Sequence, residues 1–157
     1  MMKKYLQSIV LGCLFFLVTS CDPSRYFEEN KKVDKGEWEQ NEPLLFQVTV
    51  TDTVSAFNVY LNVRNSGSYR FSNLYLFVNT IFPQGQIERD TVECQLAAPD
   101  GRWLGDGLGD IFDNRILFQQ GVRFPQTGEY RFELTQAMRI NPLPGIMDAG
   151  IRIEKAE

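Results

Sequence analysis

Hydrophobic and polar residues alternate along much of the chain after residue 43. The run 44–50 alternates phenylalanine and valine with glutamine and threonine, and the run 57–64 continues the pattern with asparagine, tyrosine and arginine at the polar positions. Successive side chains of a β-strand point to opposite faces of the sheet. The alternation therefore predicts strands with one face in a hydrophobic core and the other in solvent.

Further short runs have the same character. They cover residues 74–80, 87–96, 115–118, 122–124, 129–137 and 150–153. Glycine, proline and asparagine separate the runs, as is typical of turns between strands, and no long window shows a convincing helical period. We therefore predict an all-β fold, an antiparallel β-sandwich over residues 44–157 of either the jelly-roll or the immunoglobulin-like type.

One tyrosine supports the sandwich. Tyr130 comes two residues after Gly128, at the start of an apolar run. This spacing is found in the tyrosine corner of immunoglobulin-like domains. We expect the Tyr130 hydroxyl to hydrogen-bond a backbone group upstream, which is a stabilising role.

The first 20 residues have the layout of a secretory signal peptide. Lys3 and Lys4 precede an apolar core over residues 9–18, and Cys21 follows directly after two small residues. As a helix, ten residues span about 15 Å, half of a hydrocarbon layer of about 30 Å, so a membrane span is not expected. Residues 18–21, Val-Thr-Ser-Cys, resemble the lipobox of bacterial lipoproteins, which implies cleavage before Cys21 and acylation of that residue. A soluble secreted protein with a free thiol at Cys21 is the alternative.

Residues 21–43 are expected to form a lipidated tether. Residues 28–32 mix charges at helical spacing, which predicts a turn or two of solvated helix. Tyr26, Phe27 and Trp38 are candidates to dock part of this arm on the domain.

Charge and composition exclude several functions. Without Lys3 and Lys4, the 16 basic residues become 14 against 20 acidic ones, a net charge of −6, so nucleic acid is not an expected partner. Histidine is absent, which excludes histidine-dependent triads and His-ligated zinc. Removal of the leader and acylation of Cys21 leave Cys94 without a disulfide partner, and its strand pattern predicts a buried side chain.

A glycine-rich stretch occupies residues 99–111 and contains four glycines and three aspartates. It lacks the lysine and the helix of a phosphate-binding loop, and its aspartates do not follow the spacing of an EF-hand. We interpret it as an irregular crossover in which Trp103 and Leu104 cover the core edge while the aspartates face water. An irregular calcium site is the alternative.

Paired carboxylates could also serve a hydrolase. A glycosidase needs two carboxylates about 5 to 10 Å apart, and Asp106 with Asp110 or with Glu93 are the available candidates. Acidic residues at turns are more commonly solvated, so we expect neither catalytic residues nor a cofactor.

The order of the motifs resembles the family of gliding-motility lipoproteins called GldH. The resemblance rests on residues 58–78, Phe82-Pro-Gln-Gly85, Asp90-Thr-Val-Glu93, residues 99–105 and residues 121–139, together with Cys21. It implies a small envelope lipoprotein required for the motility apparatus and for type IX protein secretion in gliding bacteria. No enzymatic activity comes with the resemblance.

We therefore predict a non-catalytic, lipid-anchored scaffold that binds other envelope proteins. It is expected on the outer membrane, facing the periplasm. The strand-face aromatics Tyr60, Tyr75 and Phe77, with Trp103, are the candidate interaction residues. The alternative is a sandwich that binds envelope glycan or peptidoglycan, for which Trp103 would have to line an open groove.

Overall fold

The computed structural model describes residues 22–156 of the chain. The predicted signal peptide, residues 1–20, and Cys21 lie outside this range. Within the range, no helix has the length and apolar character that a membrane crossing requires.

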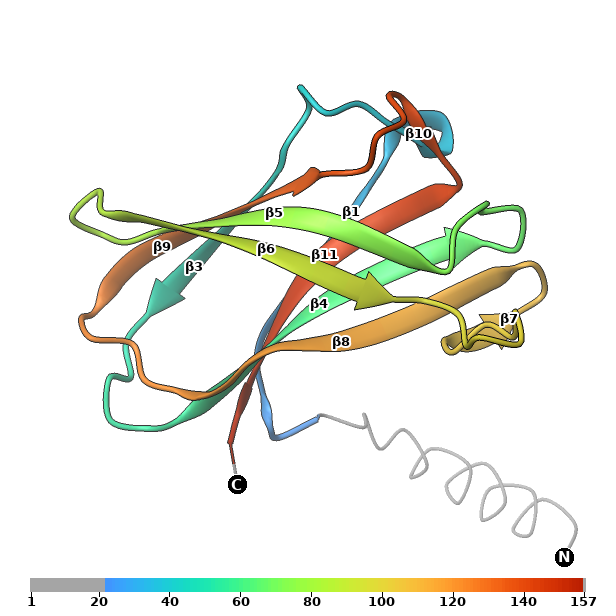
Figure 1. The fold of residues 1–157 in the computed structure, drawn as a ribbon. Helices are drawn as coiled ribbons and strands as arrows, with labels where there is room; N and C mark the ends of the chain where they lie inside the picture. The colour runs from blue at the N-terminus through green and yellow to red at the C-terminus, as the bar shows by residue number, and fades with distance from the viewer. Residues whose placement is uncertain (1–21, 157) are drawn as a thin grey trace, which may run out of the picture.

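The described residues form an all-β structure with antiparallel pairing throughout (Figure 1). Its strands are β1 Arg25–Lys32, β2 Glu37–Trp38, β3 Leu44–Val50, β4 Phe57–Ser66, β5 Asn73–Ile81, β6 Ile87–Gln95, β7 Asp106–Leu108, β8 Ile111–Val122, β9 Gly128–Gln136, β10 Leu143–Pro144 and β11 Ile146–Lys155. One sheet has the order β1-β11-β4-β8-β7 and the other β3-β9-β5-β6, while β10 pairs with β2. A 3-10 turn, η1 Asp34–Gly36, connects β1 to β2.

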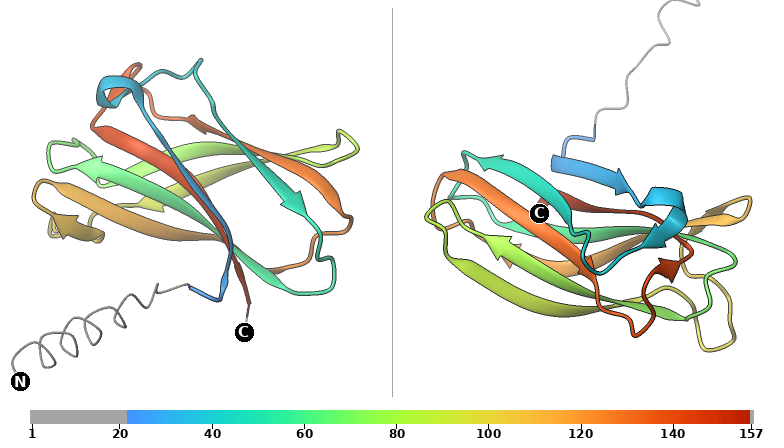
Figure 2. Two further views of the ribbon diagram at one scale, coloured as in Figure 1. Left: turned by 180° about the vertical axis from the view of Figure 1, so that it is seen from behind. Right: turned by 90° about the horizontal axis from the view of Figure 1, so that it is seen from above.

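The strand order distinguishes the two predicted types of sandwich. Without the short strands β2, β7 and β10, the eight long strands follow the order first, eighth, third, sixth in one sheet and second, seventh, fourth, fifth in the other. This interleaving is the order of a jelly roll, in which consecutive strands alternate between the two sheets except at the β5–β6 hairpin. The two sheets face each other in two further views (Figure 2).

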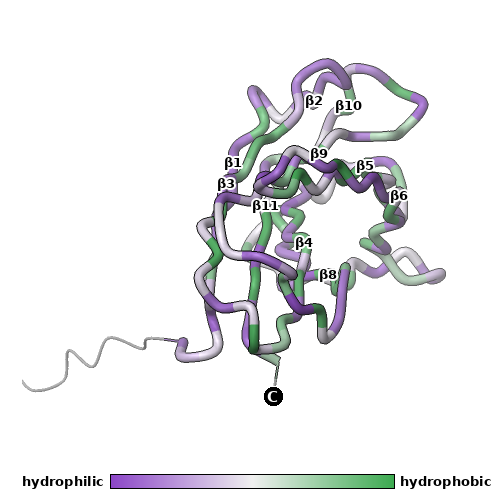
Figure 3. Tube along the Cα trace, turned by 90° about the vertical axis from the view of Figure 1, so that its left-hand side faces the viewer, coloured by the Kyte–Doolittle hydropathy of each residue, from purple (hydrophilic) through white to green (hydrophobic). Residues whose placement is uncertain are grey.

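The predicted alternation places one face of each strand in the core. In β4 the odd-numbered residues from Phe57 to Val63 are at most 1 % exposed, and Leu74, Leu76 and Val78 of β5 are fully buried. Hydrophobic and hydrophilic residues alternate along the strands in Figure 3. The Tyr130 hydroxyl donates a hydrogen bond to the carbonyl of Gln126 at 3.0 Å, which confirms the bond predicted for this tyrosine.

The prediction for residues 28–32 is wrong. These residues do not form a helical turn but belong to β1, which pairs with β11 from Arg25↔Glu154 to Lys32↔Asp148. The edge of β11 offers backbone donors and acceptors that a strand can satisfy and a helix cannot. This tertiary pairing outweighs the weak local preference of the charged residues. The sheet therefore begins at Arg25 and not at residue 44, the start that the sequence predicted.

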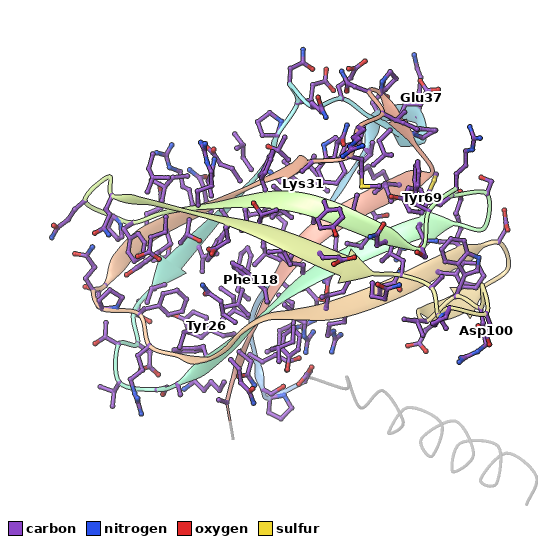
Figure 4. The ribbon with its side chains drawn as sticks, in the orientation of Figure 1. Tyr26, Lys31, Glu37, Tyr69, Asp100 and Phe118 are labelled. Atoms are coloured by element: carbon purple, nitrogen blue, oxygen red, sulfur yellow. The ribbon has the colours of Figure 1, made fainter. Side chains whose placement is uncertain are left out.

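The aromatic residues before residue 44 dock on the domain as predicted. The Tyr26 ring, labelled in Figure 4, packs on Phe57 with ring centroids 4.9 Å apart, and its hydroxyl accepts a hydrogen bond from the amide of Thr51. Trp38 is 1 % exposed, and its Nε1 donates to the carbonyl of Glu42 at 3.1 Å.

The glycine-rich stretch forms a bent crossover that ends in the short strand β7. Trp103 is half-buried, and its ring packs against Phe112 and Tyr69 at centroid distances of 5.6 and 6.5 Å. Leu104 is 49 % exposed, so the prediction that it covers the core edge is wrong. The exposed Asp100 lies at the β7 end of the molecule in Figure 4.

Candidate functional site

Polar side chains stand in register on the outer face of the five-stranded sheet. The cross-strand rows on this face are Glu28, Arg152 and Tyr60; Asn30, Gly150, Asn62 and Arg115; and Lys32, Asp148, Arg64 and Asp113. Side chains directly opposite each other on neighbouring strands interact. The strand register therefore decides which charges meet.

Arg152 of β11 is the centre of this face. Its side chain is 4 % exposed, and the guanidinium donates from Nε to Glu154 at 2.5 Å, from Nη1 to Glu28 at 2.6 Å, and from Nη2 to Asp22. Burial alone would lower the pKa of Arg152, but the hydrogen bonds to Glu154, Asp22 and Glu28 outweigh it and raise the pKa. A cation held in this way joins β1, β11 and Asp22, which precedes β1.

The carboxylates around Arg152 are held in their charged form. Hydrogen bonds from Ser24, and then from Arg152, lower the pKa of Asp22 to about 2. Burial opposes ionisation of Glu28, but hydrogen bonds from Asn62 and Arg152 are stronger in sum, so the pKa of Glu28 is lowered.

A groove of about 440 Å³ lies beside this cluster. Gly150 has no side chain, and the Asn30 side chain of β1 occupies the space above it, beside Asn62 of β4. The Asn62 amide crosses this position and donates to Glu28 at 2.9 Å and to Asn30 at 3.0 Å. A Cβ at Gly150 would collide with the Asn30 side-chain oxygen and the Glu29 carbonyl, so only glycine fits here.

At the other end of the groove, Arg64 bridges two aspartates. Its Nε donates to Asp113 at 2.5 Å and its Nη1 to Asp148 at 3.2 Å. Burial, helped by the negative charge of Asp113 and opposed by Arg64, raises the pKa of Asp148. The groove thus offers amide and charged groups to a polar ligand, but its arginines already bind carboxylates of the same chain.

The predicted aromatic residues do not form one surface. Tyr60 stands on the outer face of the five-stranded sheet, opposite Arg152. Tyr75 and Phe77 stand on the outer face of the four-stranded sheet, where they are 38 % and 43 % exposed. Trp103 packs into the crossover described above, away from either face.

The carboxylates and the cysteine that the sequence singled out lie in different parts of the structure. Asp106 pairs with Asp113 at the edge of the five-stranded sheet, whereas Glu93 lies opposite Tyr75 on the other sheet, so these two carboxylates do not face a common substrate position. Asp110 is exposed beyond the end of β7. Cys94 is buried as predicted, and burial raises its pKa to about 12. Within residues 22–156, no group of three acidic or cysteine side chains is arranged to hold a metal ion.

Sequence reasoning did not find Arg152, Gly150 or Arg64. The signal for Arg152 was its place between Ile151 and Ile153, where alternation puts it on the outer face. Alternation shows which way a side chain points. The burial of Arg152 on the outer face depends on the carboxylates of Asp22 and Glu28, which are far away in the sequence.

The two sheets and the self-paired charged face define a small all-β domain of the jelly-roll class. Residues 25–153 match the model of the GldH lipoprotein family. The chain is 35 % identical to a protein of Christiangramia forsetii named gliding motility lipoprotein GldH homolog, with 99 % of each chain covered. It is 34 % identical to the gliding motility lipoprotein GldH of Flavobacterium johnsoniae, with 96 % of this chain and 98 % of the relative covered. The chain belongs to the GldH lipoprotein family, which confirms the resemblance seen in the sequence and associates the chain with gliding motility and with a membrane.

Proposed function

We propose that the protein is a non-catalytic, lipid-anchored component of the gliding-motility and type IX secretion machinery, on the periplasmic side of the outer membrane. The observation that carries the proposal is the match to gliding motility lipoproteins along almost the whole chain. The two relatives match 99 % and 96 % of this chain, which supports a common role.

Anchoring is proposed at Cys21. The lipobox at residues 18–21 supplies the acylation signal, and burial of acyl chains contributes about 0.8 kcal/mol for each CH₂ group. Two or more chains give stable attachment where a single chain does not.

The proposal of a non-catalytic role is supported by the fact that the polar groups bind one another or are buried. Arg64, Arg115 and Arg152 each bind a carboxylate of the same chain, and the thiol of Cys94 is buried. A general acid or base must reach its substrate. The groups described here are instead engaged in holding strands together.

Tyr75 and Phe77 are proposed as the centre of the partner surface. They stand two residues apart on one face of β5. Phe77 lies between Thr91 of β6 and Thr135 of β9, and Tyr75 lies opposite Glu93 of β6. Exposed aromatic side chains on a rigid sheet are the typical anchors of protein interfaces. Trp103, the residue that the glycan alternative required in an open groove, is engaged with Phe112 and Tyr69. The protein-binding proposal is therefore the one that the structure favours.

Photocrosslinking in the native host tests this surface. A photoreactive amino acid at Phe77 should yield a discrete crosslinked band that contains another envelope protein. Leu117 is the matched control, because it is 46 % exposed on the outer face of the other sheet. Equal labelling at both positions, or recovery of the lipoprotein alone from mild detergent, would contradict the proposal.

Loss of the anchor tests the proposed location on the membrane. A Cys21→Ala variant should leave the membrane fraction and fail to support motility or secretion of type IX substrates when it replaces the native chain. The same variant with full activity would show that acylation is not required.

A further inference from the structure

The first residues that the structure describes are fixed to the sandwich. Asp22 binds Arg152, and its Oδ1 accepts hydrogen bonds from the Ser24 amide at 3.2 Å and the Ser24 hydroxyl at 2.7 Å. The Ser24 carbonyl accepts a bond from the Lys155 amide at 2.9 Å. Residues 22–24 are thus held at the end of β11, where the sequence had predicted a tether.

The surface around Asp22 is one end of the sandwich. The start of β1, the C-terminal end of β11 and the β3–β4 loop, residues 51–56, lie together there (Figures 1 and 2). Lys155 Nζ lies 3.3 Å from an oxygen of Asp52, and the Ala156 amide donates to the carbonyl of Ala56 at 2.8 Å. The loop is therefore tied to the same strand end as Asp22.

This end combines an exposed aliphatic tip with cations. Val54 is 82 % exposed, and its carbonyl accepts a hydrogen bond from Nε of Arg123 at 3.1 Å. Arg25, Arg123 and Lys155 are all exposed. Aliphatic groups surrounded by lysine and arginine suit the boundary between phosphate headgroups and acyl chains. We define the anchor-side end as residues 22–25, residues 51–56, Arg123 and Lys155.

We propose that the anchor-side end rests on the phospholipid headgroups, with Val54 in the headgroup layer, and that the contact between Asp22 and Arg152 sets this orientation. The inference rests on the proposed acylation of Cys21. Neighbouring Cα atoms are about 3.8 Å apart, so an acylated residue 21 leaves Asp22 one residue away from the lipid. Because Asp22 is itself bound to β11, the sandwich has little freedom to rotate relative to the membrane surface.

The opposite end of the sandwich provides a reference. Lys155 pairs with Phe57 at one end of β4, whereas Leu108 pairs with Ile111, which pairs with Ser66 at the other end. Ten residues of strand at about 3.3 Å each separate the two ends by about 30 Å. Leu108 is 84 % exposed, close to the 82 % of Val54, and is therefore a matched position for a probe.

Fluorescence quenching by a headgroup-attached quencher tests the orientation. The full-length acylated protein, with Cys94→Ala to remove the buried thiol, is labelled at Val54→Cys or at Leu108→Cys. It is reconstituted in vesicles of phosphatidylethanolamine and phosphatidylglycerol. The label at position 54 should be quenched several-fold more strongly than the label at position 108. Equal quenching at the two positions would overturn the proposal.

Two changes at the attachment test the role of Asp22. Asp22→Ala should reduce quenching at position 54 towards the value at position 108, whereas Asp34→Ala, an exposed acidic residue in η1, should not. A flexible insertion of about six residues between Cys21 and Asp22, with a reach of about 13 Å, should have the same effect as Asp22→Ala. Undiminished quenching in both attachment variants would refute the orienting role of Asp22.

Acylation itself is measured separately, by mass spectrometry of the same preparation. A chain without acyl groups would overturn both the proposed anchoring and the inference that rests on it. An acylated chain with equal quenching at positions 54 and 108 would overturn the orientation alone.

Discussion

The two outer faces of the sandwich differ in how their polar and aromatic residues are used. On the five-stranded sheet, Arg64 meets carboxylates of the two neighbouring strands, and Arg115 meets Glu154 of β11, across β4. Arg152 meets Glu28 of β1 and Asp22. On the four-stranded sheet, Arg89 donates to the Asn79 amide oxygen, and Glu93 accepts a hydrogen bond from Asn73. Within residues 22–156, neither Arg89 nor Glu93 forms an ion pair there.

The difference indicates a division of roles. A face whose charges are paired and partly buried holds β1 and β11 together, because loss of either partner leaves an uncompensated charge. A face with exposed Tyr75 and Phe77 contributes little to its own stability and keeps aromatic area available for a partner. Both faces carry the same alternating pattern in the sequence.

Replacement of Arg152 should change the free energy of unfolding more than any other substitution, and it tests the stabilising role of the five-stranded face. Arg152→Met keeps much of the side-chain volume but removes the shared cation of Asp22, Glu28 and Glu154. Glu28 and Glu154 then keep only the longer contacts to Arg25 at 3.6 Å and Arg115 at 3.4 Å. Removal of one partner from a buried ion pair costs about 3 kcal/mol or more, so we expect a loss of that size in the free energy of unfolding. Urea denaturation followed by circular dichroism measures it.

Arg89→Met is the matched control on the other face. Arg89 lies on the exposed edge strand β6, so its replacement should change the free energy of unfolding by no more than about 0.5 kcal/mol. Equal losses in the two variants would mean that the Arg152 cluster does not stabilise the sheet.

A methyl group at Gly150 should produce the next largest effect. Gly150→Ala drives Cβ into the Asn30 side chain and the Glu29 carbonyl, and therefore pushes β1 away from β11. Overpacking of this kind costs about 1 to 3 kcal/mol. Thermal denaturation measures it, together with hydrogen exchange of the β1 amides, which should be faster.

A second substitution tests the cause. Gly150→Ala combined with Asn30→Ala should recover part of the lost stability, because two of the three atoms in the way, Oδ1 and Cγ, belong to the Asn30 side chain. No recovery in the double variant would point to the Glu29 carbonyl as the sole obstacle.

Phe77→Ser tests the aromatic face through binding and not through stability. An interface anchor lost in this way weakens binding by about 2 kcal/mol, or roughly 30-fold, whereas the isolated domain should unfold within about 0.5 kcal/mol of the native chain. Quantitative capture of the crosslinked partner measures the first, and denaturation the second. Leu117→Ser, on the charged face, should leave capture unchanged.

The strands and their buried faces could be predicted from the sequence because alternation is a local property. The buried positions of β3, β4 and β5 are those that the pattern indicates. The partners of outward residues could not be predicted in the same way. Glu28 meets Arg152, 124 residues further along the chain, only because β1 joins the edge of β11.

The aromatic candidates illustrate the same limit. Tyr60, Tyr75 and Phe77 all occupy outward positions in their strands, and the sequence grouped them as one face. The strand order places β4 and β5 in different sheets, so Tyr60 is separated from the other two by the whole thickness of the core. Only the topology, which depends on pairings between distant segments, separates them.

Acid titration should give the smallest effect and sharpen the difference between the faces. The ordinary pKa values of Asp22 and Glu28 are 3.8 and 4.5, and both pKa values are lowered in the folded chain, that of Asp22 to about 2. A group with a lowered folded pKa stabilises the fold above its unfolded pKa and loses that contribution as the pH falls through its folded pKa. The free energy of unfolding should therefore fall between about pH 4.5 and pH 2.

The two methionine variants separate the contribution of the charged face. Asp148 acts in the opposite direction, because its raised pKa favours the folded chain as the carboxyl takes up a proton, and this offsets part of the loss. In Arg152→Met the carboxylates lose their cation, so the free energy of unfolding should depend less steeply on pH over the same range. Arg89→Met should keep the native slope, since Arg89 contacts neither Asp22 nor Glu28. Parallel slopes for all three proteins would mean that the acid sensitivity arises outside the Arg152 cluster.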